Sequence, residues 1–226
     1  MSVSELSAAT QNYLKVIWGL QEWSDSAITA SEVAAKLGLR LSSVSDAIRR
    51  LGEQGLVEHA PYGSIQLTAD GRRHALAMVR RHRLIETFLV QVLRYRWDEV
   101  HDEAEDLEHA VSDLMVDRID AFLGRPERDP HGDPIPRADG SVQRLTAIPL
   151  SEAPPGATAV VEQISDTDPG LLQFLADQGI GIGARLDVGA GAPFSEAVEI
   201  RLSGGAAISL GRAASEAVRV ALVERA

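Results

Sequence analysis

The chain of 226 residues contains no cysteine. Disulfide bridges, thiolate metal ligands and cysteine nucleophiles are therefore excluded. A metal ion in this protein has to be held by nitrogen and oxygen atoms, which its six histidines and 33 acidic residues supply.

Long apolar runs are also missing. No stretch of eighteen or more apolar residues occurs, so the sequence offers no membrane span. The first residues, MSVSELSAATQNYLKVIW, lack the basic start and the apolar stretch of a secretion signal. We therefore expect a cytoplasmic protein without a membrane partner. The 45% hydrophobic content still suffices for buried cores, and the length predicts two or three small domains.

A surplus of positive charge is the third feature that the chain lacks. Its formal net charge is −11, whereas DNA-binding domains are usually basic. The acidic excess is unevenly spread: residues 1–75 hold seven Lys/Arg against eight Asp/Glu, while 76–148 hold ten against fifteen and 149–226 hold five against ten. Net charge therefore does not exclude an N-terminal DNA-binding domain.

Residues 1–75 follow the pattern of a winged helix-turn-helix. Helically spaced apolar residues predict a helix over 7–24 and a short helix over 30–37, which Gly38 ends as a C-terminal cap. After the next amphipathic helix, alternation of apolar and polar residues over 56–68 predicts a two-stranded hairpin. This order of elements is typical of DNA-binding domains, but it also occurs in ordinary α+β cores.

In the DNA-binding interpretation, the second helix of the motif lies in the major groove with its first residues at the base edges. Serine hydroxyls bond to phosphates or bases, and arginines reach phosphates or guanine. We expect double-stranded operator DNA as the partner. The predicted DNA-binding residues are Arg40, Ser42, Ser43, Ser45, Asp46, Arg49 and Arg50, with Tyr62 at the tip of the hairpin.

Residues 76–148 are predicted to form a helical domain with a proline-rich arm. Two long helical patterns cover about 69–93 and 98–123, and seven of the ten prolines fall between Pro126 and Pro155, where they break helices. The two helices carry more apolar residues than one small domain covers, so we predict a homodimer. Its contact residues are predicted to be Leu84, Phe88, Leu114 and Phe122.

Residues 149–226 alternate short β-type runs with glycine turns, interrupted by one helical patch over 170–179. This pattern predicts a small five-stranded barrel. The expected fold class is therefore α+β multidomain, with a winged helix-turn-helix, a helical domain and a small β-barrel in that order.

The sharpest chemical signal is the segment VHDEAEDLEHAVSD. At about 100° per residue, four of its side chains fall near 0°, 40°, −20° and 80°, on one helical face: His101, Glu105, Glu108 and His109. Carboxylates and imidazoles clustered in this way repel or compete unless a cation joins them. The preceding helix places His82 and Glu86 one turn apart, and antiparallel packing would bring both sets together. A site without sulfur suits Mn²⁺, Fe²⁺ or Zn²⁺.

Three other interpretations stay open. The carboxylates form only a solvated acidic face in the first, and the protein buffers metal without binding DNA in the second. In the third, Glu105-x-x-Glu108-His109 is a variant of a metalloprotease helix or part of a carboxylate-bridged metalloenzyme, although no matching second motif is present. We therefore expect no enzyme and no small-molecule substrate. Three histidines lack such companions and are interpreted as structural or surface residues: His59, His74 and His131.

The segments RRHRLIETFL, WDEVHDEAEDLEHAVSD and DPHGDPIP together resemble the diphtheria toxin repressor family of metal-dependent regulators, in its manganese-sensing branch. The resemblance covers nearly the whole chain. It implies a DNA-binding winged helix-turn-helix over 1–75, a helical metal-binding and dimerisation domain with the arm over 76–148, and an SH3-like (FeoA-like) domain over 149–226.

The resemblance also implies two metal sites. The primary site consists of Asn12, Glu105, Glu108 and His109. The ancillary site consists of His82, Glu86 and His101, joined by Asp168 of the SH3-like domain. A second polar position of that domain falls on Leu171, which cannot ligate.

Two positions indicate which metal ion the protein binds. Iron-sensing members of the family carry cysteine where Glu105 stands and methionine where Asn12 stands, whereas manganese sensors carry carboxylates at both. Glu105 follows the manganese pattern, and Asn12 offers an uncharged amide oxygen. The resemblance implies a Mn²⁺-dependent repressor of metal-homeostasis genes such as those for manganese uptake, with Fe²⁺, Co²⁺ or Zn²⁺ as substitutes. An iron-responsive regulator of the same family is the alternative.

Overall fold

The computed structural model describes residues 3–23, 26–59, 64–143, 145–192, 194–202 and 205–223. Its packing divides the chain into two compact units, each built from several segments. The first consists of Met1–His82, Asp106–Arg118 and Pro136–Val142, and the second of Arg83–Glu105, Ile119–Ile135 and Gln143–Ala226. Within the described residues, no helix is long and apolar enough to cross a membrane.

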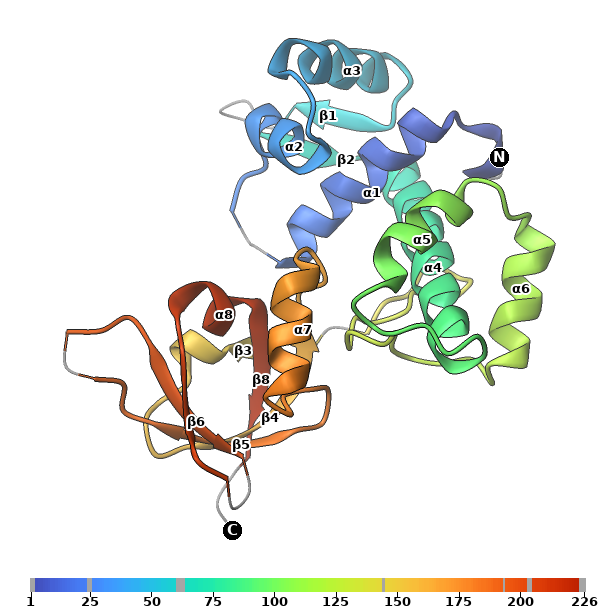
Figure 1. Ribbon diagram of the computed structural model, residues 1–226. Helices are drawn as coiled ribbons and strands as arrows, with labels where there is room; N and C mark the ends of the chain where they lie inside the picture. Colours follow the sequence, from blue (N-terminus) through green and yellow to red (C-terminus); the bar gives the residue numbers. More distant parts are fainter. Residues whose placement is uncertain are drawn as a thin grey trace. The chain divides into compact units, whose positions relative to one another are not determined.

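The first unit contains the winged helix-turn-helix (Figure 1). Its elements are η1 (Val3–Glu5), α1 (Ala8–Trp23), α2 (Ala30–Leu37), α3 (Leu41–Glu53), β1 (Val57–His59), β2 (Ile65–Leu67) and the start of α4 (Ala69–Gln91). Thr29 and Glu32 form a capping box at the start of α2, and Gly38 ends it with φ 65°, which confirms the predicted cap. β1 and β2 pair antiparallel, and the hairpin tip, residues 60–63, lies outside the described residues.

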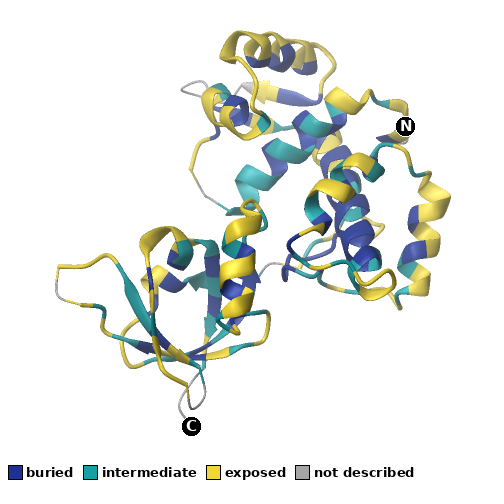
Figure 2. Cartoon of the chain, viewed as in Figure 1, coloured by how far each residue is buried: buried dark blue, intermediate teal, exposed yellow. Residues whose placement is uncertain are grey.

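One apolar core joins α1 to the helix-turn-helix. Leu14 and Ile17 of α1 are buried in the same cluster as Val44 and Ile48 of α3. The opposite side of α3 is exposed (Figure 2). Because close-packed cores move as a whole, a displacement of α1 carries α3 with it.

The helix expected over 98–123 is interrupted. The structure has two helices there, α5 (Val100–Glu108) and α6 (Asp113–Phe122). Ser112 explains the break, because its Oγ accepts a hydrogen bond from the backbone N–H of Met115 and so begins a new helix. The prediction of a single helix is therefore wrong, and the predicted metal ligands of this segment lie on α5 or directly after it: His101, Glu105, Glu108 and His109.

The second unit contains the C-terminal domain. Its elements are β3 (Ile148–Pro149), η3 (Leu150–Glu152), β4 (Thr158–Ile164), α7 (Pro169–Asp177), β5 (Arg185–Gly189), β6 (Val198–Leu202), β7 (Ala207–Leu210), α8 (Arg212–Ala217) and β8 (Val218–Leu222). The strands form one antiparallel sheet in the order β3-β8-β4-β5-β6-β7. All five predicted strands are present, and the two-residue β3 adds a sixth. Apolar side chains such as Ile164, Leu172 and Val220 form the core of this domain.

The proline-rich arm packs on β4. The backbone N–H of Ile164 donates to the carbonyl oxygen of His131 at 2.9 Å. Gly132 has φ +87°, and a Cβ at this position would lie 2.1 Å from the carbonyl oxygen of Glu162. Glycine is required here for both reasons, and the close approach fixes the buried side chains of Asp129 and His131.

Candidate metal centres and DNA-binding face

The predicted DNA-binding residues of α3 are available to a partner. All seven are exposed: Arg40, which directly precedes α3, and Ser42, Ser43, Ser45, Asp46, Arg49 and Arg50 on it. Arg49 Nη1 lies 2.7 Å from Glu53 Oε1, and because both side chains are exposed this pair is weak and open to competition from a phosphate. Tyr62 lies outside the described residues.

Polar side chains of α1 and α4 surround the end of α5 in the first unit. We call this group the α1/α5 cluster; its members are Gln11, Lys15, His82, Glu108 and His109, and Asn12 directly follows Gln11 on α1.

Glu108 is the central carboxylate of the α1/α5 cluster. Its side chain is fully buried; Oε1 lies 2.6 Å from Lys15 Nζ and Oε2 lies 2.7 Å from His82 Nδ1. Burial alone would raise the pKa of Glu108, but His82 and Lys15 hold that pKa below its ordinary value. The carboxylate is therefore charged and able to bind a cation.

Gln11 determines how the ring of His109 is presented. Its Nε2 donates to the carbonyl oxygens of Val3 at 2.8 Å and Leu6 at 3.0 Å, so its Oε1 has to be the atom that faces His109 Nδ1 at 2.7 Å. An amide oxygen only accepts, and Nδ1 therefore carries the proton. In the neutral ring, Nε2 presents its lone pair 3.5 Å from Glu108 Oε1. His109 is thus oriented as a ligand.

Asn12 carries an unsatisfied acceptor. Its Oδ1 is buried and has no hydrogen-bond partner among the described residues. A buried oxygen without a donor costs free energy, and a cation removes that cost. Asn12 directly follows Gln11, whose side chain contacts His109, and an amide oxygen, the carboxylate of Glu108 and the lone pair of His109 are donors that fit the divalent ion that the family resemblance implies.

The second unit holds a separate group of carboxylates and imidazoles. We call it the α4/arm cluster; its members are Glu86, His101, Glu105, Asp129, His131 and Asp166.

His101 forms the ion pairs of the α4/arm cluster. Its Nδ1 lies 2.9 Å from Asp166 Oδ2 and 3.4 Å from Glu86 Oε1, and its Nε2 lies 3.7 Å from Glu105 Oε1. Burial alone would lower the pKa of His101, but Asp166 and Glu86 raise it to about 10. Burial alone would raise the pKa of Asp166, but His101 lowers it to about 2. At neutral pH an ion that binds this imidazole has to replace a proton.

Three buried members of the α4/arm cluster come from α4 and the arm. Glu86, Asp129 and His131 offer ligand atoms within 4.8 Å of one another. His131 Nε2 donates to the carbonyl oxygen of Trp97 at 2.7 Å, so in the neutral ring Nδ1 presents its lone pair, 3.9 Å from Glu86 Oε2. Burial, with the charges of Asp133 and Glu86, raises the pKa of Asp129 well above its ordinary value. The interpretation of His131 as a structural or surface residue missed these companions, which are distant in sequence.

Two of the predicted ligands also contact a residue of the other predicted set. His82, expected with the ancillary residues, contacts Glu108. Glu105, expected with the primary residues, contacts His101. The helical faces were predictable from spacing, but which neighbouring helix meets each turn is set by tertiary packing.

Asp168 has another role in the structure. It caps α7, where its Oδ1 accepts hydrogen bonds from the backbone N–H groups of Gly170 at 2.9 Å and Leu171 at 3.2 Å. The carboxylate of the C-terminal domain that contacts His101 is Asp166, two residues earlier. Asp166 therefore belongs to the α4/arm cluster, whereas the predicted residue was Asp168.

The residues predicted to form a dimer interface differ in exposure. Leu114 and Phe122 of α6 are 68% and 70% exposed, and Phe88 packs edge-on against Phe122 with ring centroids 6.3 Å apart. Leu84 is fully buried within its own chain, so it is corrected from an interface residue to a core residue. The apolar face available for a second copy is therefore on α6.

Three family models match successive parts of the chain. The iron dependent repressor N-terminal DNA binding domain matches residues 5–65, and the iron dependent repressor metal binding and dimerisation domain matches residues 68–137. The FeoA domain matches residues 148–222.

Individual relatives are similar over most of their length. The iron-dependent repressor IdeR of Mycobacterium leprae (strain TN) is 32% identical over 198 residues, which cover 82% of this chain and 86% of that protein. A solved manganese-dependent transcriptional repressor in complex with manganese is 51% identical with a TM-score of 0.90, covering 95% of this chain and 100% of that chain. The crystal structure of ScaR with bound Zn²⁺ is 28% identical with a TM-score of 0.83, covering 95% of this chain and 99% of that chain. The chain therefore belongs to the iron-dependent repressor family, that of the diphtheria toxin repressor: it is a metal-dependent DNA-binding transcriptional repressor with a C-terminal SH3-like domain, and not an enzyme.

Proposed function

We propose that Mn²⁺ is the ion that activates this repressor, with Fe²⁺, Co²⁺ and Zn²⁺ as substitutes. The buried donors are carboxylate and amide oxygens and imidazole nitrogens, a set that favours hard or borderline divalent ions. Similarity to a manganese-dependent repressor at 51% identity supports the same choice. We further propose that the regulated genes serve metal homeostasis, manganese uptake among them, and that the protein acts in the cytoplasm.

The observation that carries the metal proposal is the charged, buried Glu108 with His82 and His109 beside it, and the buried, unsatisfied Oδ1 of Asn12 on α1 supports it. The ligands that we propose from the first unit are Asn12, His82, Glu108 and His109. Those that we propose from the second unit are Glu86, His101, Glu105 and Asp166, with Asp166 in place of Asp168.

The proposed mechanism couples the α1/α5 cluster to DNA through the core of the first unit. A bound cation supplies positive charge that oxygen and nitrogen ligands share. Asn12 then holds α1 against the end of α5, and Gln11 keeps His109 turned toward the same place. Since Leu14 and Ile17 pack with the residues of α3, fixing α1 also fixes the recognition helix. The ion favours DNA binding only to the extent that it prefers this arrangement.

We propose that the DNA partner is a double-stranded operator, bound by a homodimer through the exposed residues of α3 and the hairpin. The wing residue Tyr62 stays a prediction. We also propose domain boundaries after residues 75 and 148. Three family matches support them: one ends at residue 65, one covers 68–137 and one begins at 148. A dimer places two recognition helices on two half-sites.

A titration of labelled promoter DNA with the full chain, repeated with Mn²⁺, Fe²⁺ and Zn²⁺, tests the proposed function. We expect a retarded complex only with metal, at the lowest metal concentration for Mn²⁺. Binding that is equally tight with a chelator would refute the metal requirement. The name of the 32%-identical mycobacterial relative favours iron as the second candidate, and a lower threshold for Fe²⁺ than for Mn²⁺ would establish it.

A further inference from the structure

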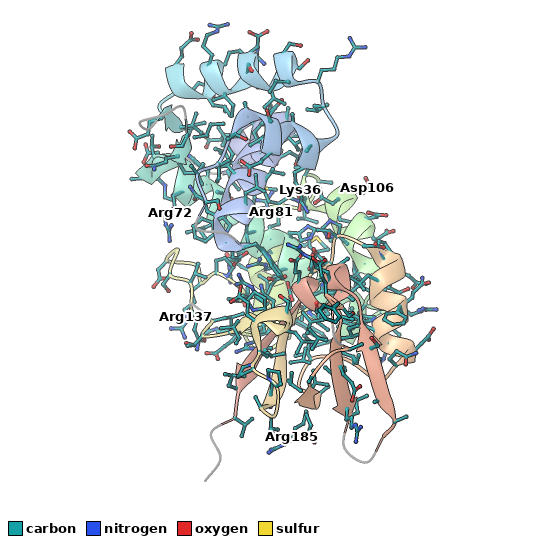
Figure 3. The ribbon with its side chains drawn as sticks, turned by 90° about the vertical axis from the view of Figure 1, so that its left-hand side faces the viewer. Lys36, Arg72, Arg81, Asp106, Arg137 and Arg185 are labelled. Carbon is teal, nitrogen blue, oxygen red and sulfur yellow. The ribbon has the colours of Figure 1, made fainter. Side chains whose placement is uncertain are left out.

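Lys15 supplies a positive charge at the most buried carboxylate of the α1/α5 cluster. Its Nζ lies 2.6 Å from Glu108 Oε1, and the two side chains are 13% and 0% exposed. The chain has only one other lysine, Lys36, which lies exposed on α2 (Figure 3). A lysine ammonium is a compact charge on a flexible stem, so it can approach one oxygen and also withdraw.

The position of Lys15 on α1 places it on the same helical face as Asn12, three residues earlier. Glu108 Oε2 already faces His82, so Oε1, the atom that Lys15 contacts, is also the Glu108 oxygen nearest to His109 Nε2 at 3.5 Å. An ion held by Glu108 and His109 would meet the ammonium at this oxygen. Like charges at such short range repel strongly in a buried setting.

We propose that Lys15 is a built-in counter-cation, which neutralises Glu108 in the metal-free protein and has to leave it when a divalent ion binds. Lys15 thereby raises the metal concentration at which the repressor becomes active. This inference rests on the proposed metal-activated function. In this proposal, two residues of α1 have opposite effects on metal binding. Asn12 offers an oxygen to the ion, whereas Lys15 competes with the ion for Glu108.

A purely structural salt bridge makes a different prediction. Removing one partner of a buried pair leaves the other charge uncompensated and destabilises the protein. If Lys15 serves only the fold, its loss lowers stability equally with and without metal. If Lys15 is a counter-cation, a divalent ion takes over its role at Glu108, and the loss of stability disappears when metal is added.

Isothermal titration of the full chain with MnCl₂ tests the proposal. Lys15→Met keeps the length and the apolar stem of the side chain, and Lys36→Met is the matched control. We expect Lys15→Met to tighten Mn²⁺ binding on the order of tenfold, because a repelling charge is removed. Lys36→Met should bind as the wild type does. Should Lys15→Met fail to fold, Lys15→Gln replaces it in the same titration.

Thermal unfolding of the same variants provides the second readout. The metal-free Lys15→Met protein should unfold at a lower temperature than the wild type, and Mn²⁺ should raise its Tm by more than it raises that of the wild type. Equal or weaker Mn²⁺ binding by Lys15→Met, beside a wild type that binds, would overturn the role of Lys15 and leave the proposed function intact. A wild type that binds no Mn²⁺ would overturn both.

Discussion

The α1/α5 cluster and the α4/arm cluster neutralise their buried carboxylates in different ways. In the first, Glu108 is balanced by the side-chain cation Lys15 and by His82. In the second, Asp166 is balanced by a proton-bearing His101, and Asp129 has a raised pKa because it is buried and other carboxylates lie nearby. If both clusters bind an ion as we propose, the ion displaces an ammonium from one cluster and a proton from the other. The first cluster is tuned by a residue of α1, and the second by pH.

Of the substitutions considered, Glu108→Gln should change Mn²⁺ binding most, because it acts on the α1/α5 cluster and leaves the α4/arm cluster intact. It removes the buried carboxylate that contacts Lys15, His82 and His109, and we expect Mn²⁺ binding to weaken by about a hundredfold or more, since even outer-shell changes cost up to about that much. Metal-dependent operator binding should be lost. Glu103→Gln, an exposed change on the same helix, is the control. An unaltered Mn²⁺ titration of Glu108→Gln would assign the activating ion to the α4/arm cluster alone.

Gln11→Leu should weaken Mn²⁺ binding about tenfold, because the acceptor that orients His109 is lost. Gln11→Glu keeps an acceptor for His109 Nδ1 but loses the donors to Val3 and Leu6. The affinity for Mn²⁺ should therefore be retained in Gln11→Glu and fall in Gln11→Leu. The chemical shifts of the ring nitrogens of His109 show which tautomer each variant has. Equal losses in both variants would mean that Gln11 matters only for the fold of the N-terminal segment.

Asn12→Asp should tighten Mn²⁺ binding, by about tenfold or less, because a charged oxygen is a stronger ligand for a hard cation than an amide oxygen. The metal concentration needed for operator binding should fall in parallel. Ala9→Asp adds the same charge at an exposed position of α1 and serves as the control. Titration calorimetry in which both variants match the wild type would remove Asn12 from the metal site.

The smallest expected effect is the release of a proton when an ion binds to the α4/arm cluster. The pKa of His101 is raised from 6.5 to about 10, so its stabilising charge is fully present below about pH 6.5 and is lost as the pH rises through about 10. The pKa of Asp166 is lowered from 3.8 to about 2, so its contribution is present above about pH 3.8 and is lost as the pH falls through about 2. Calorimetry of Glu108→Gln at pH 7 in two buffers of different ionisation enthalpy should show about one proton released per bound ion. Binding without proton release would show that His101 is no ligand.

Helical spacing predicted which side chains of α5 lie on the same face. Glu108 and His109 share a face of α5 and its end, as periodicity predicted, and Gly38 and the hairpin register follow from local rules. A local rule also explains why the segment predicted as one helix forms two, since Ser112 caps the start of α6.

The remaining contacts depend on tertiary packing. Nothing near His131 in the sequence indicates Glu86, because the two residues are 45 positions apart and only the packing of the arm on α4, for instance the hydrogen bond from Arg83 to the carbonyl oxygen of Pro134, brings them together. The loop before α7 determines which carboxylate contacts His101. Asp168 caps α7, and Asp166, two residues earlier, contacts His101. Lys15 has the sequence pattern of an ordinary polar helix residue, and only the fold brings its ammonium to a buried carboxylate.

The central claim is that metal and operator bind to linked states of one protein. The direct test is the Mn²⁺ affinity of the full chain measured with and without saturating operator DNA, beside the operator affinity with and without Mn²⁺. Linkage requires the two ratios to be equal, and couplings of this kind typically amount to about 5- to 150-fold. We predict equal ratios above one for the wild type and ratios near one for Glu108→Gln. A wild type whose Mn²⁺ affinity is the same with and without operator would contradict the account.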